Sequence, residues 1–236
     1  MPAGPVIDGH TANAGYYDST TISLTLTTSL SNDWIFVFVY NESQPQSVSR
    51  SVSLVAGGGL TWHQRGSIQS SLGDYCSVDI WYAFAASPLS AAVITVTFSG
   101  PGDDYAAVAC GINNSGTSTP FDTAPGLPAH AAVASGTVTV SFSTVAANCL
   151  GLAFCGSVNN SVAAIPGGWA LVDSAHTNAG GLDAGAALWS IAFPLPQGGA
   201  SVTASPLGGG VLMAVDVIAP PATAGGGSAP IILSMM

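Results

Sequence analysis

Any chemistry in this chain has to come from twelve acidic side chains, four histidines and four cysteines. The one adjacent acidic pair is Asp103 and Asp104, which follows the turn signal Gly100-Pro101-Gly102. Neighbouring residues on a strand point to opposite faces, so this pair is poorly placed for general acid–base catalysis. In a loop the two carboxylates could help to coordinate calcium, although the EF-hand spacing is absent. A solvated turn is the simpler interpretation.

The histidines and cysteines are scattered along the chain. The histidines are His10, His63, His130 and His176, and none lies in an HxH or HExxH pattern. The cysteines are Cys76, Cys110, Cys149 and Cys155, without a CxxC pair or a Cys/His zinc spacing. No GxSxG elbow marks a serine nucleophile. We therefore expect a protein that is not an enzyme and that uses no cofactor and no metal.

The cysteine spacing also bears on disulfides. Cys149 and Cys155 are six residues apart on an expected strand, so their side chains share one face and lie about 20 Å apart. A straight strand cannot bridge them. We expect buried or half-buried thiols that act as small hydrophobic side chains, and a disulfide between different strands is the alternative.

The composition excludes several classes of protein. The 236 residues carry a formal net charge of −10, and the two cations are Arg50 and Arg65, with no lysine. Two arginines cannot form the basic stripe that binds nucleic acid or the polybasic segment that binds a membrane surface. A hydrophobic content of 48% argues against disorder, and charged helix-forming residues are too few for a helical bundle. No run of about 18 apolar residues indicates a membrane-spanning helix.

Strand patterns recur at short intervals in the first half of the chain. Apolar and polar residues alternate in several segments, and one continuous apolar run has the length of a strand buried on both faces. The expected strands are Ile22–Leu26, Trp34–Tyr40, Val48–Val55, Val78–Phe84, Ile94–Phe98 and Tyr105–Ile112. Glycine, proline and asparagine turns separate them. Many short strands with such turns predict an all-β fold, an antiparallel β-sandwich of jelly-roll type.

The second half of the chain repeats this pattern. Residues 21–28 align without a gap on residues 137–144, and residues 105–112 align on residues 211–218. We therefore predict two pseudo-repeated halves, at about 21–113 and 137–219, joined by a linker at 114–136. The alternative is that strands rich in threonine and valine look alike by composition.

The halves could form one continuous sandwich over residues 16–219 or two small sandwiches. We favour the continuous sandwich, because a half of about 90 residues has only five or six short strands. Extended arms are expected outside it, at residues 1–15 and 220–236. The second arm is a glycine- and proline-rich linker with an apolar end that could dock on its own sandwich or on a neighbouring subunit. The expected assembly contacts there are Ile231, Ile232, Leu233, Met235 and Met236.

Several short motifs occur in a fixed order between about residues 20 and 219. They are Ser31-Asn32-Asp33, Gly59-Leu60-Thr61-Trp62, Ile80-Trp81-Tyr82-Ala83, Val96-Thr97-Phe98-Ser99-Gly100, Pro120-Phe121-Asp122-Thr123, Asn148-Cys149-Leu150 and Gly167-Gly168-Trp169. As a set they resemble a two-part β-sandwich domain of uncharacterised bacterial surface proteins and of structural or tail-associated proteins of tailed phages. The resemblance implies a fold and a surface or virion context, and it carries over no catalytic residue.

The start of the chain decides between these two contexts. Met1–Pro5 lacks the charged and apolar regions of a secretory signal, which bacterial members usually have. We therefore expect a non-enzymatic structural protein of a tailed phage virion, as a capsid decoration, tail or fibre-associated module. Its assembly would take place in the host cytoplasm. Its partners would be other virion proteins and further copies of itself, with no nucleic acid and no membrane.

The tryptophans support an alternative function. In a carbohydrate-binding or adhesion module at a cell or virion surface, Trp62 and Trp169 would be the residues that stack on a glycan. These two occupy equivalent positions in the two repeats, as do Trp81 and Trp189. Positions that recur in both repeats are explained more simply by packing, so the glycan-binding interpretation ranks second.

Overall fold

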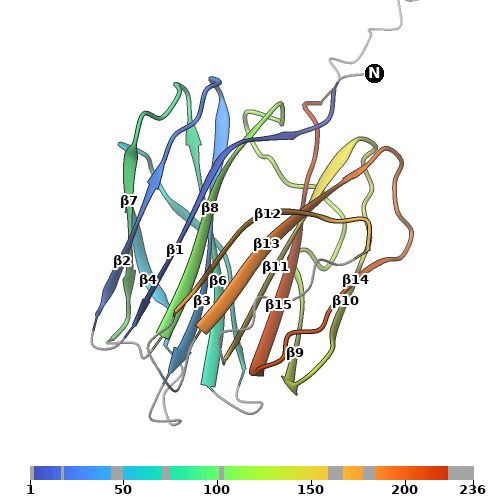
Figure 1. Ribbon diagram of the computed structural model, residues 1–236. Coiled ribbons are helices and arrows are strands. Elements are labelled where there is room, and N and C mark those ends of the chain that lie inside the picture. Colours follow the sequence, from blue (N-terminus) through green and yellow to red (C-terminus); the bar gives the residue numbers. More distant parts are fainter. Residues whose placement is uncertain are drawn as a thin grey trace, which may run out of the picture.

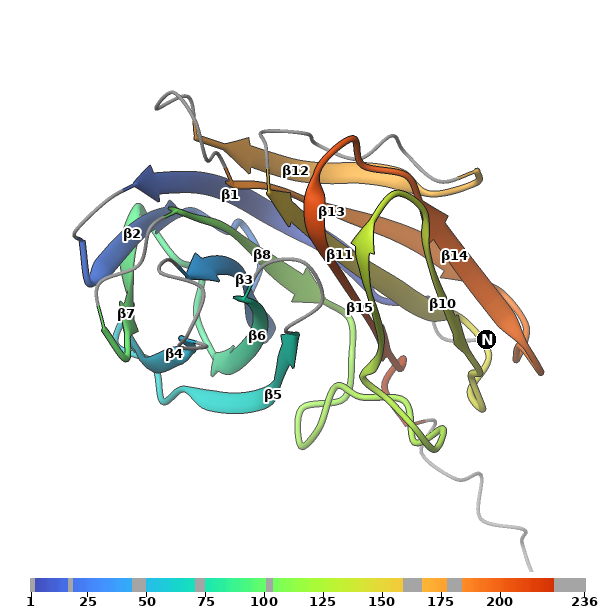
Figure 2. The same ribbon diagram turned by 90° about the horizontal axis from the view of Figure 1, so that it is seen from below.

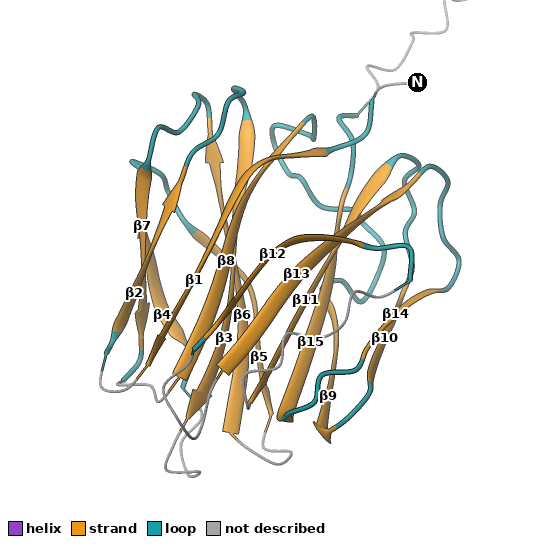
Figure 3. Ribbon diagram, in the orientation of Figure 1, coloured by secondary structure: helices purple, strands orange, loops and turns teal. Residues whose placement is uncertain are grey.

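The structure is a computed structural model that describes residues 3–16, 19–43, 50–70, 75–100, 104–158, 167–177 and 184–222. These residues form fifteen strands and no helix (Figures 1 and 3). All pairings between the strands are antiparallel. The expected antiparallel all-β fold is confirmed. No helix in the described part of the chain is long and apolar enough to span a membrane.

The first half of the chain forms two sheets. The first large sheet has the strand order β1-β8-β3-β6-β5, and the first small sheet has the order β2-β7-β4. The strands are β1 (Val6–Tyr16), β2 (Thr21–Leu26), β3 (Asp33–Ser43), β4 (Val52–Gly57), β5 (His63–Ser70), β6 (Tyr75–Ala85), β7 (Ala92–Phe98) and β8 (Asp104–Asn113).

The second half forms two further sheets. The second large sheet has the order β12-β13-β11-β15-β9, and the second small sheet consists of β10 and β14. The strands are β9 (Ala129–Ser135), β10 (Val138–Phe142), β11 (Cys149–Val158), β12 (Ala170–His176), β13 (Ala184–Phe193), β14 (Ala200–Ala204) and β15 (Gly209–Ile218).

The central strands explain how the four sheets stack. Side chains alternate between the two faces of a strand, and both faces of β3 and of β11 are buried. On one face of β3, Phe36 and Phe38 join a core that also contains Leu152 and Phe154 of β11. The opposite face of β3 packs on the first small sheet, and that of β11 packs on the second. The molecule is therefore a four-layer stack, with the two large sheets face to face in the middle (Figure 2).

Each half has one large and one small sheet, and the large sheets of both halves share one core, so the expected sandwich over residues 16–219 is a stack of four layers. Two parts of the predicted domain plan differ from this structure. The predicted N-terminal arm, residues 1–15, instead supplies most of β1, which pairs with β8. The predicted linker, residues 114–136, contains β9, which pairs with β15. The predicted C-terminal arm lies outside the described residues beyond residue 222.

The strand orders of the two large sheets correspond position by position. When the second is read from its other edge, β9-β15-β11-β13-β12 matches β1-β8-β3-β6-β5. Even the irregularities agree, because β5 has a register shift between Gln64 and Gly66, and β12 has one between Leu171 and Asp173. This agreement is what an internal duplication would produce, and the duplication itself stays a prediction.

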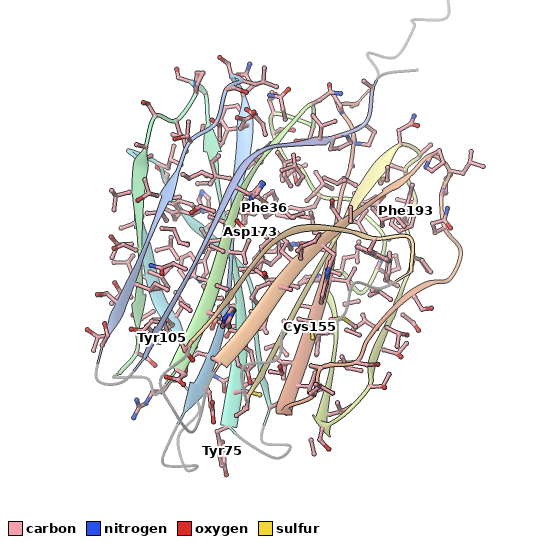
Figure 4. All side chains as sticks on the ribbon, in the orientation of Figure 1. Phe36, Tyr75, Tyr105, Cys155, Asp173 and Phe193 are labelled. Atoms are coloured by element: carbon pink, nitrogen blue, oxygen red, sulfur yellow. The ribbon has the colours of Figure 1, made fainter. Side chains whose placement is uncertain are left out.

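The two halves contact each other through a continuous apolar core. The rings of Phe38 and Phe154 stack with their centroids 5.5 Å apart. The Tyr40 hydroxyl donates a hydrogen bond to the carbonyl of Gly210 in the other half, at 2.9 Å. Figure 4 shows how densely side chains fill the layers, with Phe36 among those labelled. The large sheets therefore form the interface between the halves as well as the centre of the fold.

Candidate functional site

The described residues enclose one aromatic pocket at an end of the first large sheet. Its volume is about 390 Å³. Four of its side chains carry rings, and the others belong to the loops after β4 and β8. The lining residues are Trp34, Gly59, Leu60, Thr61, His63, Tyr82, Phe84, Ser118 and Thr119. We call this set the aromatic pocket.

Strand register brings the rings of the aromatic pocket together. Trp34 on β3 lies opposite Phe84 on β6, and His63 on β5 lies opposite Tyr82 on β6. Tyr82 and Phe84 are two residues apart, so both point to the same face of the sheet. The centroid of the Trp34 ring is 5.7 Å from that of Tyr82 and 5.1 Å from that of Phe84. Three neighbouring strands thus present a continuous aromatic wall.

Contacts with the other half and with a loop fix this wall in place. The indole Nε1 of Trp34 donates a hydrogen bond to the carbonyl oxygen of Gly116, at 2.6 Å. Tyr82 meets the edge of Phe121, a residue that pairs with the second half, with ring centroids 4.9 Å apart. The guanidinium of Arg65 on β5 lies 3.9 Å from the centre of the same Phe121 ring. The rings are therefore held by the interface between the halves.

The aromatic pocket is uncharged. None of its lining residues is acidic, and neither arginine of the chain is among them. The hydroxyls of Thr61, Ser118 and Thr119 belong to exposed residues at its rim, together with the exposed imidazole of His63. The pocket therefore offers ring faces and neutral hydrogen-bonding groups.

The acidic residues are used elsewhere, mostly as buried structural groups. Seven of the eight acids in the described part of the chain are buried, namely Asp8, Asp33, Glu42, Asp79, Asp104, Asp122 and Asp216. The eighth, Asp173, accepts a hydrogen bond at 2.9 Å from the imidazole of His10. No group of three or more histidine, cysteine or acidic side chains suited to a metal occurs among the described residues.

Two of the buried acids hold equivalent turns in the two halves. Asp8 accepts hydrogen bonds from the backbone N–H groups of Ser29 and Leu30, at 2.9 and 2.7 Å. Asp122 accepts hydrogen bonds from the backbone N–H groups of Val145 and Ala146, which follow Ser29 and Leu30 by 116 residues. Burial raises the pKa of Asp8, but the hydrogen bonds from Ser29 and Leu30 outweigh it, so the pKa is lowered from 3.8. These carboxylates serve the fold.

Asp79 and Asp104 are also structural. Asp79 accepts hydrogen bonds from the Val52 N–H at 3.1 Å and from the Ser77 hydroxyl at 3.2 Å. Burial raises its pKa, although these hydrogen bonds oppose the shift. Asp104 accepts one from the Thr177 hydroxyl at 3.2 Å. Asp103, its neighbour in the acidic pair, lies outside the described residues.

The four cysteines are free and buried, as expected. Cys149 and Cys155 share one face of β11 and belong to the core under the second small sheet. Burial raises the pKa of the Cys110 and Cys155 thiols to about 12, which keeps them protonated and unreactive. Their role is that of small apolar side chains.

The tryptophans named for glycan stacking, Trp62 and Trp169, do not line the aromatic pocket. Trp169 is only 7% exposed and packs edge-on against Phe142 and Phe193. Trp62 is half-buried against the core of the first half, and its Nε1 donates to the Gly57 carbonyl at 3.2 Å. The expected assembly contacts, Ile231, Ile232, Leu233, Met235 and Met236, lie outside the described residues.

Sequence reasoning missed the residues of the aromatic pocket. The repeat alignment compared positions that agree between the halves, whereas Trp34 and Tyr82 are positions where the halves differ. Those differences were the signal that could have found them. Comparisons of the chain with protein-family models, curated proteins and solved structures gave no match.

Proposed function

We propose that the chain is a non-enzymatic structural protein of a tailed phage virion that acts by packing against neighbouring subunits. The observation that carries this proposal is the chemistry of the two small sheets, which form the outer layers of the stack. None of their five strands contains a charged residue. Exposed sheet edges normally carry lysine or other charges that block pairing with further strands. Another subunit could therefore pack against these edges without burying a charge.

The outer faces of the small sheets support the same proposal. Thr139 and Thr203 pair across β10 and β14 with their hydroxyls 2.9 Å apart, and Thr137 and Ser205 do the same beside them. Desolvating a hydroxyl that keeps a partner costs far less than desolvating a charge. Such a face can be buried in a subunit contact without a counter-ion.

Two further observations fit a structural role. The described acids are buried in turns and interfaces, or bonded to a histidine in the case of Asp173, which leaves them to hold the fold. The motif set between residues 20 and 219 resembles structural and tail-associated phage proteins. The proposal therefore rests on surface chemistry, on the use of the acids and on that resemblance.

The direct test is whether the protein is part of a particle. We expect it in density-purified virus particles by mass spectrometry, at fixed stoichiometry, and on the particle surface by antibody labelling in electron microscopy. A Ser141→Lys change places a cation on the exposed face of β10 and should give a folded protein that no longer joins particles. A Ser118→Lys change, at an exposed loop residue that belongs to neither small sheet, is the matched control.

The C-terminal residues allow a second test of assembly. Removing residues 225–236 deletes the apolar end of the chain, and we expect a folded protein that does not assemble. Normal incorporation of the truncated chain would contradict the anchoring role. Absence of the protein from purified particles would contradict the structural role as a whole.

A further inference from the structure

The aromatic pocket has no counterpart in the described residues of the second half. The two large sheets have matching strand orders and registers, so each ring position has an equivalent position in the second half. The equivalents of Trp34, His63, Tyr82 and Phe84 are Leu150, Ala170, Ser190 and Ala192. All four aromatic positions are therefore aliphatic or small in the other half, although the strands that carry them are the same.

Only some of the core rings recur in the second half. Phe38 corresponds to Phe154 and Trp81 to Trp189, whereas the buried Phe36 and Tyr40 correspond to Leu152 and Gly156. At the pocket positions all four rings are lost in the second half, where the same strand arrangement forms without them. The strand arrangement therefore does not require these rings, although Trp34 also belongs to the shared core.

We propose that the aromatic pocket binds a neutral carbohydrate. The C–H groups on one face of a sugar ring carry partial positive charge, and the face of an aromatic ring is negative, so the two attract. Tyr82 and Phe84 are only half-buried and can offer such a face. The rim hydroxyls of Thr61, Ser118 and Thr119 can donate and accept hydrogen bonds to sugar hydroxyls.

The absence of charge in the lining selects the class of sugar. A phosphate, a sulfate or an acidic sugar needs a cation, and neither arginine of the chain lines the pocket. The volume of about 390 Å³ lies near the lower end for ligand pockets, which suits one or two sugar residues at a chain end or branch.

The pocket is also preorganised. The Trp34 ring is fixed by its hydrogen bond to Gly116, and Tyr82 is held between His63 and Phe121, at centroid distances of 5.5 and 4.9 Å. Rings that are already ordered lose little conformational entropy when a ligand binds. If the protein binds glycans, this site assigns the binding to residues other than Trp62 and Trp169. The proposal does not depend on whether the protein belongs to a virion.

The test is titration of the full chain with neutral oligosaccharides of glucose, galactose, mannose and N-acetylglucosamine, followed by calorimetry and by tryptophan fluorescence. We expect at least one to bind, and its affinity to fall about tenfold or more in Tyr82→Ala. Thr119→Trp provides a second variant, because it fills the pocket from an exposed rim position and leaves the core unchanged. It should abolish binding in a protein that melts as the wild type does.

Trp62→Ala is the matched control, since it removes a half-buried ring that lies between the lining residues Thr61 and His63 but does not itself line the pocket. We expect it to change affinity by no more than about twofold. Three outcomes would overturn the proposal: no binding of any of these sugars to the folded wild type, binding that survives both Tyr82→Ala and Thr119→Trp, or binding lost only in Trp62→Ala.

Discussion

At the scale of single residues, the acids of this protein act as internal hydrogen-bond acceptors. Asp122 shows this most clearly, because its carboxylate accepts from the backbone N–H groups of Ala124, Val145 and Ala146, at 2.7 to 3.1 Å. It also accepts from the Cys149 thiol at 3.4 Å. One side chain thus supplies the partners that three N–H groups of the turns would otherwise lack.

Replacing Asp122 with alanine should therefore destabilise the protein strongly. Buried N–H groups without partners cost about 1–3 kcal/mol each when no water can reach them, so we expect a loss of about 2–4 kcal/mol in the free energy of unfolding. Urea denaturation measures this loss. Asp122→Asn keeps one acceptor oxygen and should lose less. The control is Thr123→Ala at the exposed neighbouring residue, which should change the free energy of unfolding by no more than about 0.5 kcal/mol. An equal loss in Asp122→Ala and Thr123→Ala would refute the capping role.

The residues of the aromatic pocket show where sequence reasoning stops at this scale. Burial on both faces of Trp34–Tyr40 was predictable, because a continuous apolar run of strand length is typical of a fully buried strand. That Trp34 meets Phe84 and that Tyr82 meets His63 depends on strand register. Register is set by pairing along whole strands, and periodicity within one strand does not specify it.

At the scale of elements, strands with clear apolar alternation are predictable and strands without it are not. Residues 22–26 alternate fully and form β2, with the expected burial pattern. β1, β9 and β12 consist largely of small and polar residues, and such composition predicts an arm at β1 and a linker at β9. All three lie at the edges of the large sheets, where backbone hydrogen bonds to β8, β15 and β13 hold them. The alternation of apolar and polar side chains therefore does not reveal such edge strands in the sequence.

A small residue also decides how closely two elements approach. Gly156 on β11 faces the ring of Tyr40 on β3, and a Cβ at Gly156 would come within 2.2 Å of that ring. The Tyr40 ring is fully buried and is anchored by its hydroxyl on Gly210, so it has no room to move. The close contact of the two large sheets at this point depends on glycine.

Gly156→Ala should therefore push the large sheets apart locally. Overpacking of a core by a methyl group costs typically about 1–3 kcal/mol, and we expect a value at the upper end because an anchored ring meets the new atom. Thermal denaturation with calorimetry gives the measurement. Gly167→Ala is the matched control, because a Cβ at Gly167 would meet no atom within 4 Å. Equal melting temperatures for Gly156→Ala and wild type would contradict the close contact.

At the scale of the whole molecule, one ion pair across the interface between the halves has an apolar pair at the equivalent positions. Arg65 on β5 donates to both carboxylate oxygens of the buried Asp216 on β15, at 2.8 and 3.2 Å. The equivalent positions are Val172 on β12 and Cys110 on β8, and both belong to or pack on the shared core. The same place in the fold is therefore ionic in one case and apolar in the other.

This comparison predicts a rescue. Arg65→Val alone leaves the Asp216 carboxylate buried without its cation and should cost about 3–5 kcal/mol. Adding Asp216→Cys rebuilds the apolar pair that the other side of the interface already accommodates, so the double variant should recover most of that loss. Denaturant unfolding of the two single variants and the double variant gives the coupling free energy. Additive losses would show that the ion pair has a further role in joining the halves.

Buried acids also set the response of the whole molecule to pH. Burial raises the pKa of Asp33, Asp79 and Asp216 above 3.8, so the folded state binds their protons more tightly than the unfolded state does. Their destabilising effect is fully present at neutral pH and is relieved as the pH falls through the raised values. Asp8 acts in the opposite sense, and its contribution is lost only below 3.8, as the pH falls through its lowered pKa.

We therefore expect the melting temperature to rise as the pH is lowered from about 7 toward about 4, and to fall again at lower pH, where Asp8 loses its contribution. Loss of negative charge from a chain of net charge −10 acts in the same direction over the first interval. Asp79→Asn should reduce the rise, because it removes one of the three titrations. A melting temperature that decreases steadily from about pH 7 to about pH 4 would contradict the raised pKa of these acids.

The ion pair between Arg65 and Asp216 also limits digestion of the protein. Trypsin cleaves only after lysine and arginine, so a chain with no lysine and two arginines offers it two sites among 236 residues. Arg65 lies within β5, and its guanidinium is held against a buried carboxylate, so the protease must open that strand before it can cut. The folded protein thus offers no more than Arg50 to trypsin-like enzymes.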